Sequence, residues 1–181
     1  MKRTIIICGL AGGLIVTSWM ILAMAGFFKD AMSIGGMLLG YTTMLVAFSM
    51  IYVAVKNTRD KYNDGIISFG KAFKIGLIVT LIASTMYVLV WMVDYYNFVP
   101  DYLDKYYAHM IAKMKTDGAT AAAIQKATAD GQSFNKLYKN PLVCAMYTYL
   151  EILPVGLLVS LVCALILKRR VYAGVLVESK A

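Results

Sequence analysis

A carboxylate and a proline lie close together inside the last long apolar stretch of the chain, residues 142–167. An acidic side chain in hydrocarbon costs on the order of a few kcal/mol, so we expect Glu151 to face other helices or water rather than lipid. Pro154 lacks a backbone N–H, and we expect it to kink a helix and to free a carbonyl group near residue 150. With Gly156 nearby, this acid and proline are the best single candidate for a polar site.

A second carboxylate, Asp94, is expected at a similar depth. At roughly 1.5 Å per helical residue, Glu151 lies about 25 Å along its helix from Lys168, and Asp94 lies similarly far from Ile75 in its own stretch. The two acids could therefore meet in one proton site, cation site or polar pocket. Alternatively, each acid is solvated or paired at the headgroup boundary, and the sequence favours this interpretation. Three lysines are candidate partners: Lys29, Lys105 and Lys139.

Catalytic and metal-binding motifs are not recognisable in the sequence. The single histidine, His109, has no H-E-x-x-H or Cys-His arrangement around it, so we expect it at the surface. The three cysteines show no paired spacing, which predicts buried thiols rather than a disulfide or metal framework. We therefore expect a protein that is not an enzyme and has no cofactor and no bound metal.

The elements that position these residues are four long apolar stretches. Of the 181 residues, 60% are hydrophobic and 15% are charged, which is too apolar for a soluble domain and indicates one membrane domain over residues 1–181. A helix of about 20 apolar residues crosses roughly 30 Å of hydrocarbon. The sequence therefore predicts an all-α fold, a bundle of four transmembrane helices. They are expected over residues 5–28, 34–55, 75–96 and 142–167.

The first apolar stretch has an alternative interpretation as a secretory signal peptide, because Ala23-Met24-Ala25 resembles a cleavage site. The apolar core of a signal is only about 7 to 15 residues long, and this stretch is longer. We therefore expect an uncleaved first helix, followed by a tight turn at Lys29 and Asp30.

The segment 97–140 is polar, and its pattern predicts a helical extracytoplasmic loop between the third and fourth transmembrane helices. A first helix is expected over residues 100–118, beginning at a proline. An alanine-rich helix over residues 120–130 is expected to stop at Gly131, and a third short helix is expected over residues 133–138.

The basic residues lie in short clusters at the ends of the apolar stretches. The formal net charge of +8 therefore reflects retention of cytoplasmic loops rather than nucleic-acid binding. Most of the 18 Lys and Arg residues lie at the N-terminus, in the loop 56–74 and in the C-terminal tail, which predicts a protein of the cytoplasmic membrane with both termini in the cytoplasm. Ser68 can cap the third helix. Five basic side chains are expected at lipid headgroups: Lys71, Lys74, Lys168, Arg169 and Arg170.

Small residues recur at four-residue spacing in every predicted transmembrane helix. In lipid no hydrophobic effect draws helices together, so small residues matter because they allow close backbone approach. Such stripes in all four helices favour a compact bundle, and they could equally mediate homo-oligomerisation. Their glycines are Gly9, Gly13, Gly36, Gly40, Gly76 and Gly156.

Three short segments carry a resemblance to a known family. They are Ile66-Ile67-Ser68-Phe69-Gly70-Lys71-Ala72-Phe73-Lys74, Tyr138-Lys139-Asn140-Pro141-Leu142, and Pro154-Val155-Gly156-Leu157 ahead of a basic end. In this order they resemble the DUF4199 family of small bacterial integral membrane proteins, and the resemblance extends from the first helix to Arg170. It implies a bacterial membrane protein of uncharacterised function, with no catalytic residues to carry over.

Two hypotheses for the function follow. The first is a non-enzymatic scaffold or accessory subunit that acts on an unknown membrane partner through the bundle and the helical loop. The second is a small transporter or channel whose polar pathway includes Glu151 and Asp94. A cavity that reaches Glu151 would favour transport, whereas a dry and tightly packed bundle would favour the scaffold.

Overall fold

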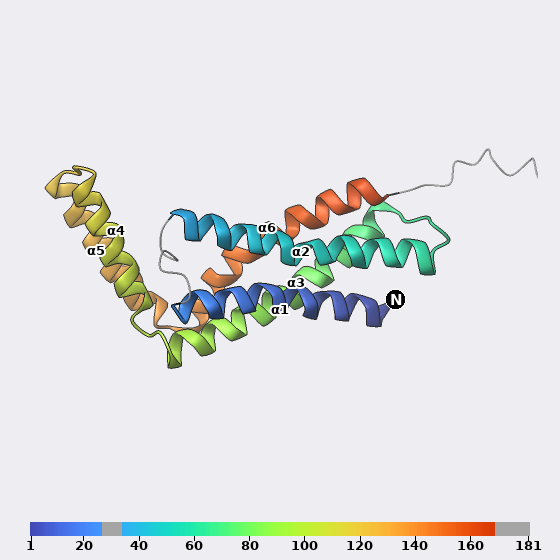
Figure 1. Ribbon diagram of the computed structural model, residues 1–181, viewed down its shortest axis with the longest axis horizontal. Coiled ribbons are helices and arrows are strands. Elements are labelled where there is room, and N and C mark those ends of the chain that lie inside the picture. The colour runs from blue at the N-terminus through green and yellow to red at the C-terminus, as the bar shows by residue number, and fades with distance from the viewer. Residues whose placement is uncertain (27–33, 169–181) are drawn as a thin grey trace, which may run out of the picture.

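The computed structural model of the protein describes residues 1–26 and 34–168, and all the long elements in this part are helices (Figure 1). The predicted all-α fold is confirmed, as is the position of a helical segment between the third and fourth long helices. The helices are α1 (Lys2–Met24), α2 (Ile34–Tyr62), α3 (Phe69–Asn97), α4 (Tyr102–Thr116), α5 (Ala121–Tyr138) and α6 (Pro141–Leu167).

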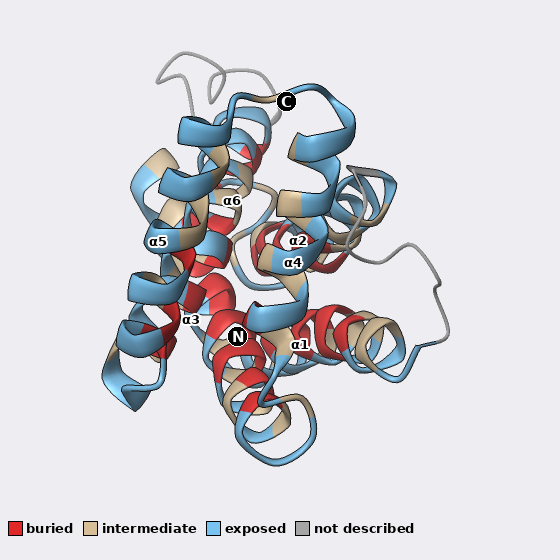
Figure 2. Ribbon diagram, turned by 90° about the vertical axis from the view of Figure 1, so that its left-hand side faces the viewer, coloured by how far each residue is buried: buried red, intermediate tan, exposed pale blue. Residues whose placement is uncertain are grey.

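Helices α1, α2, α3 and α6 are long and apolar enough to cross a membrane. Large apolar side chains such as Leu38 and Leu158 are exposed on the outside of the bundle, where lipid would cover them. Small and polar side chains such as Thr80 and Ser160 are buried between the helices instead. Figure 2 colours the helices by burial, and the buried residues lie where the helices of the bundle face one another.

Helices α2 and α3 each pack against the other three long helices, and α3 makes the most extensive contacts, with α1 and with α6. The chain runs toward the α4 and α5 pair along α1, back along α2, toward that pair again along α3 and, after α4 and α5, back along α6 (Figure 1). We call the end of the bundle that carries α4 and α5 the hairpin end. Lys2, Phe69 and Leu167 therefore lie at the opposite end of the bundle.

Two glycines of α1 allow α1 and α3 to approach each other closely. A Cβ atom at Gly9 of α1 would lie 2.8 Å from Ile82, and one at Gly13 would lie 2.7 Å from the Met86 sulfur. The two residues of each pair are separated by the same number of positions in the sequence, as parallel helices require. Gly40 is different, because its added Cβ would meet only the Trp19 Nε1 atom at 3.9 Å, an ordinary contact distance.

Two helix boundaries differ from the prediction. Helix α2 continues past residue 55 to Tyr62, because Thr58 is still fully buried and the polar last turn remains helical. Helix α3 starts at Phe69, ahead of the apolar stretch expected from residue 75, and Ser68 caps it by accepting a hydrogen bond from the Lys71 N–H at 3.4 Å. The predicted cap is confirmed, and residues 69–74 extend the helix before the membrane-crossing stretch.

The loop helices also differ from the prediction. Pro100 lies in a turn before α4 rather than inside the helix, and Asp101 is the N-cap residue. Gly131 does not end a helix, because α5 runs through it without a break. A Cβ atom at Gly131 would lie 2.7 Å from Cδ1 of Tyr107 in α4, so this glycine serves the packing of α4 on α5.

Several predicted features fall at the margins of the described residues. Outside them lie the end of the first apolar stretch, the turn at Lys29 and Asp30, and the basic residues Arg169 and Arg170.

Two other basic residues with a predicted position are described. Lys71 and Lys74 are both exposed near the start of α3, and the Lys71 ammonium donates a hydrogen bond to Asn63 Oδ1 at 2.7 Å.

Candidate functional site

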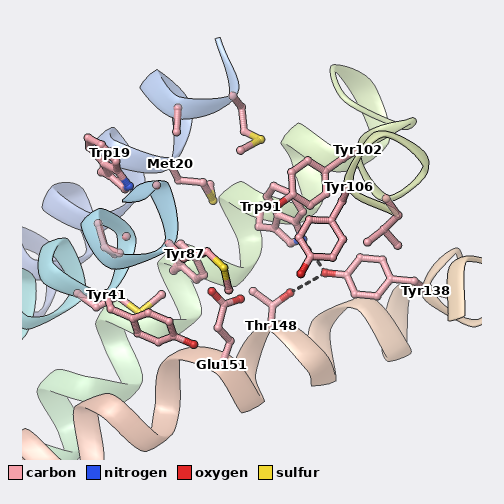
Figure 3. Close-up of a pocket in the computed structure, with 18 residues that line it drawn as sticks. Trp19, Met20, Tyr41, Tyr87, Trp91, Tyr102, Tyr106, Tyr138, Thr148 and Glu151 are labelled. Carbon is pink, nitrogen blue, oxygen red and sulfur yellow. Dashed lines mark hydrogen bonds between the residues drawn. The ribbon is translucent and has the colours of Figure 1, made fainter. Parts of the chain in front are cut away.

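A cavity of about 350 Å³ lies between the helices at the hairpin end (Figure 3). All six helices named above contribute to its walls, so the cavity belongs to the tertiary structure rather than to one segment. Aromatic rings dominate the lining: Trp19, Tyr41, Tyr87, Trp91, Tyr102, Tyr106 and Tyr138. Methionine side chains fill much of the remaining wall: Met20, Met24, Met37 and Met44.

Glu151 is the single charged residue among the described residues that line this cavity. Thr148 precedes it by three positions on α6, so the two side chains share one face of the helix. Figure 3 shows the Glu151 carboxylate pointing away from α6 into the cavity, toward Tyr87. The carboxylate makes no hydrogen bond and no ion pair with any described residue. The hypothesis that Glu151 faces a polar space rather than lipid therefore agrees with its position.

A directed chain of hydrogen bonds stiffens one wall of the cavity. The Trp91 indole N–H donates to the Tyr138 hydroxyl at 2.8 Å, and the Thr148 hydroxyl donates to the Cys144 carbonyl at 2.8 Å. The Tyr138 and Thr148 oxygens are 3.3 Å apart. Because the Thr148 hydrogen is already committed, Tyr138 is the donor in this middle bond. The chain joins the ends of α3, α5 and α6 and holds the Trp91 ring at the cavity edge.

Helix α4 brings two further rings into the same space. Tyr102 and Tyr106 are four residues apart and therefore lie on one face of α4. The Tyr102 ring stands edge-on to the Trp91 ring, with centroids 5.1 Å apart and planes at 82°. This T-shaped arrangement is a favourable geometry for aromatic pairs. The hairpin thus closes one side of the cavity with aromatic side chains.

Tyr102 of α4 and Tyr138 of α5 stay protonated over a wide pH range. Burial, with smaller effects from the Glu151 charge and from Tyr106, raises the pKa of Tyr102 to about 12. Burial also raises the pKa of Tyr138, although its hydrogen bonds with Thr148 and Trp91 act in the opposite direction. Both residues therefore face the cavity as neutral phenols.

Asp94 does not line this cavity, so the predicted site shared by the two acids gains no support from it. Asp94 is half-buried near the end of α3, and its Oδ2 atom is buried without a hydrogen-bond partner in the described part of the chain. The physical reason is the register of α3 against α6. The Thr85 hydroxyl lies 2.8 Å from the Tyr149 hydroxyl, so Glu151 lies beside the part of α3 around Thr85, whereas Asp94 lies nearer to the hairpin end.

The expected lysine partners are not found at Glu151 either. Lys105 forms an ion pair with Asp101 on its own helix, with Nζ and Oδ2 2.8 Å apart. Lys139 is exposed, and its carbonyl oxygen accepts a hydrogen bond from the Tyr96 hydroxyl at 3.1 Å. Lys29 lies outside the described residues.

The sequence analysis missed the aromatic lining. Trp19 and Tyr41 were not singled out, because they lie in apolar stretches where single rings are common. A usable signal was present: both tryptophans of the chain, Trp19 and Trp91, occur near the same end of their apolar stretches. Both line the cavity.

The side chains around the cavity offer several kinds of noncovalent contact. Within the described residues, no group of three or more His, Cys, Asp or Glu side chains could hold a metal ion. His109 is exposed on α4, as expected, and stays outside the cavity. The chemistry that the cavity does offer is one anionic carboxylate, the faces of several aromatic rings, and soft thioether groups.

Four helices that can cross a membrane, with a carboxylate-bearing cavity between them, define a multi-pass helical membrane protein with an internal cavity. The family model described as "Protein of unknown function (DUF4199)" matches residues 7–169. The chain belongs to the DUF4199 family, as its three short segments indicated. No protein with a curated description and no solved structure matches the chain.

Proposed function

We propose that this protein is a non-enzymatic membrane protein that binds a small organic solute in the cavity at Glu151 and carries it through the membrane. The observation that supports this proposal is a carboxylate without a protein partner, inside a cavity between membrane-spanning helices. A bundle that served only as a scaffold would gain stability by filling the space. Lost packing contacts and a solitary intramembrane carboxylate both cost free energy.

The size of the cavity fits this function. Pockets for small molecules usually have volumes of roughly 300–1,000 Å³ and combine apolar walls with a few polar groups. The cavity here, at about 350 Å³, lies at the small end of that range. Beyond the hydroxyl and indole N–H groups of its aromatic lining, its polar groups are Thr148 and Glu151, which lie one turn apart on α6. A compact solute with one polar or charged end matches this distribution.

We propose that the cavity opens toward the outside of the cytoplasmic membrane and that both chain termini face the cytoplasm. Support comes from Lys2 and Lys168, which belong to the same end of the bundle, opposite to the cavity, together with the most basic loop. Reporter enzymes fused to the N-terminus, to the C-terminus and within the turn between α4 and α5 test this orientation. The two terminal fusions should be active only as cytoplasmic reporters, and the fusion in the hairpin only as an exported one.

The solute-binding function can be tested without a label, because both tryptophans of the protein line the cavity. Protein in lipid nanodiscs is titrated with a panel of small cations, anions and neutral compounds. A compound that enters the cavity should change the tryptophan emission in a saturable manner and raise the melting temperature. The same compound should then be taken up by liposomes that contain the protein.

Gly40 allows a matched pair of variants for this experiment. An added side chain at Gly40 has space, since its Cβ would meet only Trp19 at 3.9 Å, so Gly40→Leu fills the cavity without displacing a helix. Gly70 at the opposite end has nothing within 4 Å, so Gly70→Leu is the control. Gly40→Leu should abolish both the emission change and uptake, and Gly70→Leu should leave them intact. Equal responses from the two variants would overturn the proposed function.

A second function, as a scaffold for a membrane partner, is favoured by a different observation. The hairpin of α4 and α5 projects from the bundle (Figure 1), and exposed residues such as Lys113 and Lys126 cover its outer faces. If this surface holds a partner, Lys113→Glu with Lys126→Glu should reduce the size of the complex in native electrophoresis of gently solubilised membranes. Gly40→Leu, which alters only the cavity, should leave that size unchanged.

A further inference from the structure

We propose that the solute is a monovalent organic cation of the ammonium type, whose charged head lies among the aromatic rings beside Glu151. This inference rests on the proposed function and adds the chemical class of the ligand. It joins two features of the cavity, the unpaired carboxylate and the aromatic lining.

The charge of the cavity favours a cation. Glu151 contributes a negative charge, and the described part of the lining contains no Lys, Arg or His that could neutralise it. The carboxylate points into the cavity, toward Tyr87 (Figure 3). A carboxylate in a space of low dielectric constant attracts a cation more strongly than it would in water and repels an anion. One positive charge on the ligand would balance the site.

The aromatic lining favours an organic cation over an inorganic one. Ring faces attract ammonium heads, and aromatic cages recognise quaternary ammonium groups for this reason. Here Trp19, Trp91 and several tyrosines surround the space into which Glu151 points (Figure 3). Hard metal cations prefer several carboxylate, carbonyl and water ligands, whereas this cavity offers one carboxylate, a Thr148 hydroxyl already engaged in hydrogen bonds, and the hydroxyls of tyrosines.

The methionines suit the same ligand. Thioethers are polarisable and adapt to irregular apolar shapes, so Met20 and Met44 can pack against the alkyl groups of an ammonium head. Thioethers can also bind soft monovalent metals such as silver. The cavity methionines come from two different helices and line it together with many rings, which favours packing over coordination. Silver ion is therefore included as a competing probe.

The test compares each cation with its neutral carbon isostere. Choline and 3,3-dimethylbutan-1-ol have almost the same shape and differ in charge, so their difference in affinity isolates the charge. Tryptophan emission and isothermal titration calorimetry in nanodiscs measure both, with benzyltrimethylammonium as a larger cation and with sodium, potassium and silver ions as inorganic probes. We expect the affinity for choline or benzyltrimethylammonium to be at least about tenfold higher than the affinity for the neutral isostere.

Two carboxylates provide a matched pair of variants. Glu151→Gln should reduce the affinity for the cations to that of the isostere and leave the affinity for the isostere unchanged. Asp94→Asn removes an acid that does not line the cavity, so it should change neither affinity.

If Glu151→Gln does not fold, Tyr41 provides a second pair, since its side chain lines the cavity and is 47% exposed. Tyr41→Phe keeps the ring and should retain cation binding, whereas Tyr41→Leu should weaken it.

The outcomes separate this inference from the proposed function. If the isostere binds as tightly as choline and Glu151→Gln has no effect, the cavity binds a solute but the cationic class is wrong. If silver or an alkali metal ion binds at Glu151 and organic cations do not, the class is also wrong. If no probe changes the emission and Gly40→Leu behaves like Gly70→Leu, both proposals are overturned.

Discussion

The Thr80 hydroxyl lies 3.2 Å from the Ser160 hydroxyl across the interface of α3 and α6, although the two residues are 80 positions apart in the sequence. Ser160 donates its hydrogen to the Gly156 carbonyl at 2.7 Å, so Thr80 is the donor to Ser160. A Cβ at Gly76 would lie 2.7 Å from the Ser160 Oγ, and one at Gly156 would overlap Thr80. Each helix thus places a glycine opposite a hydroxyl residue of the other, which fixes the antiparallel register.

This hydrogen bond should be measurable as a coupling energy. In a double-mutant cycle of Thr80→Ala and Ser160→Ala, we expect a coupling of about 0.6 kcal/mol, and at most about 1.7 kcal/mol, in line with interhelical hydrogen bonds in membranes. The measurement is reversible unfolding in mixed micelles. As a control, Thr80→Ala combined with Thr17→Ala should be additive, because the Thr17 hydroxyl bonds only within α1.

The close contact at Gly156 predicts a strong effect of a single methyl group. Gly156→Ala places a Cβ against Thr80 and 2.9 Å from Phe48 Cζ, and all of these residues are buried, so α3 and α6 must separate. We expect a loss of about 1–3 kcal/mol in the free energy of unfolding. Gly70→Ala, which meets open space, should not destabilise the protein. Equal stabilities of the two variants would contradict the packing described here.

The bond from Trp91 to Tyr138 predicts a spectroscopic change. Tyr138→Phe removes the acceptor of the buried Trp91 N–H at 2.8 Å, and leaving a buried donor unpaired costs about 1–3 kcal/mol. We expect a shifted tryptophan emission spectrum together with a lower melting temperature. Tyr147→Phe is the control, because the Tyr147 hydroxyl makes no hydrogen bond with the described residues. An unchanged spectrum for Tyr138→Phe would show that the bond does not form.

The cavity should make Tyr102 an unusually weak acid. Its pKa is raised to about 12 from an ordinary value of 10.0, chiefly by burial and then by the Glu151 charge. The folded protein therefore holds this proton more tightly than the unfolded chain. The resulting stability is fully present below about pH 10 and is lost as the pH rises through about 12.

Ultraviolet absorbance of tyrosinate measures this titration. Tyr102→Phe should remove a component that titrates near the raised pKa, and Glu151→Gln should shift that component to lower pH. Tyr62→Phe, at an exposed position in the last turn of α2, is the control and should leave the Tyr102 component unchanged. A Tyr102 component that does not respond to Glu151→Gln would mean that the two groups do not share the cavity.

The close contact of Gly131 with Tyr107 predicts that a side chain at this position weakens the packing of α4 on α5. Gly131→Ala brings a Cβ to 2.7 Å from the Tyr107 ring and should loosen α4 from α5 without unfolding the bundle. Hydrogen exchange should become faster in residues 102–138 and stay unchanged in α1. Ala129→Ser, at an exposed position one half-turn away, is the control and should leave the hairpin protected.

Local properties of the sequence determined much of the fold. Length and apolarity identify four membrane-spanning helices, because about 20 apolar residues satisfy all of their backbone groups only as a helix in hydrocarbon. Ser68 was recognisable as a cap, since a cap depends on residues three positions apart. Glu151 was recognisable as a residue that should face other helices or water rather than lipid. Gly131 was misread, because its role depends on Tyr107 of another helix.

Only the tertiary structure decided which side chains meet around Glu151. Counting residues gives a position along one helix, but which side chains of two helices meet depends on how those helices are shifted and rotated against each other. Pairs such as Gly76 with Ser160 set this register, which leaves Asp94 nearer to the hairpin end than Glu151 and outside the cavity that Trp19 and Trp91 line. The sequence of one helix does not record the register, because register is a property of two packed surfaces.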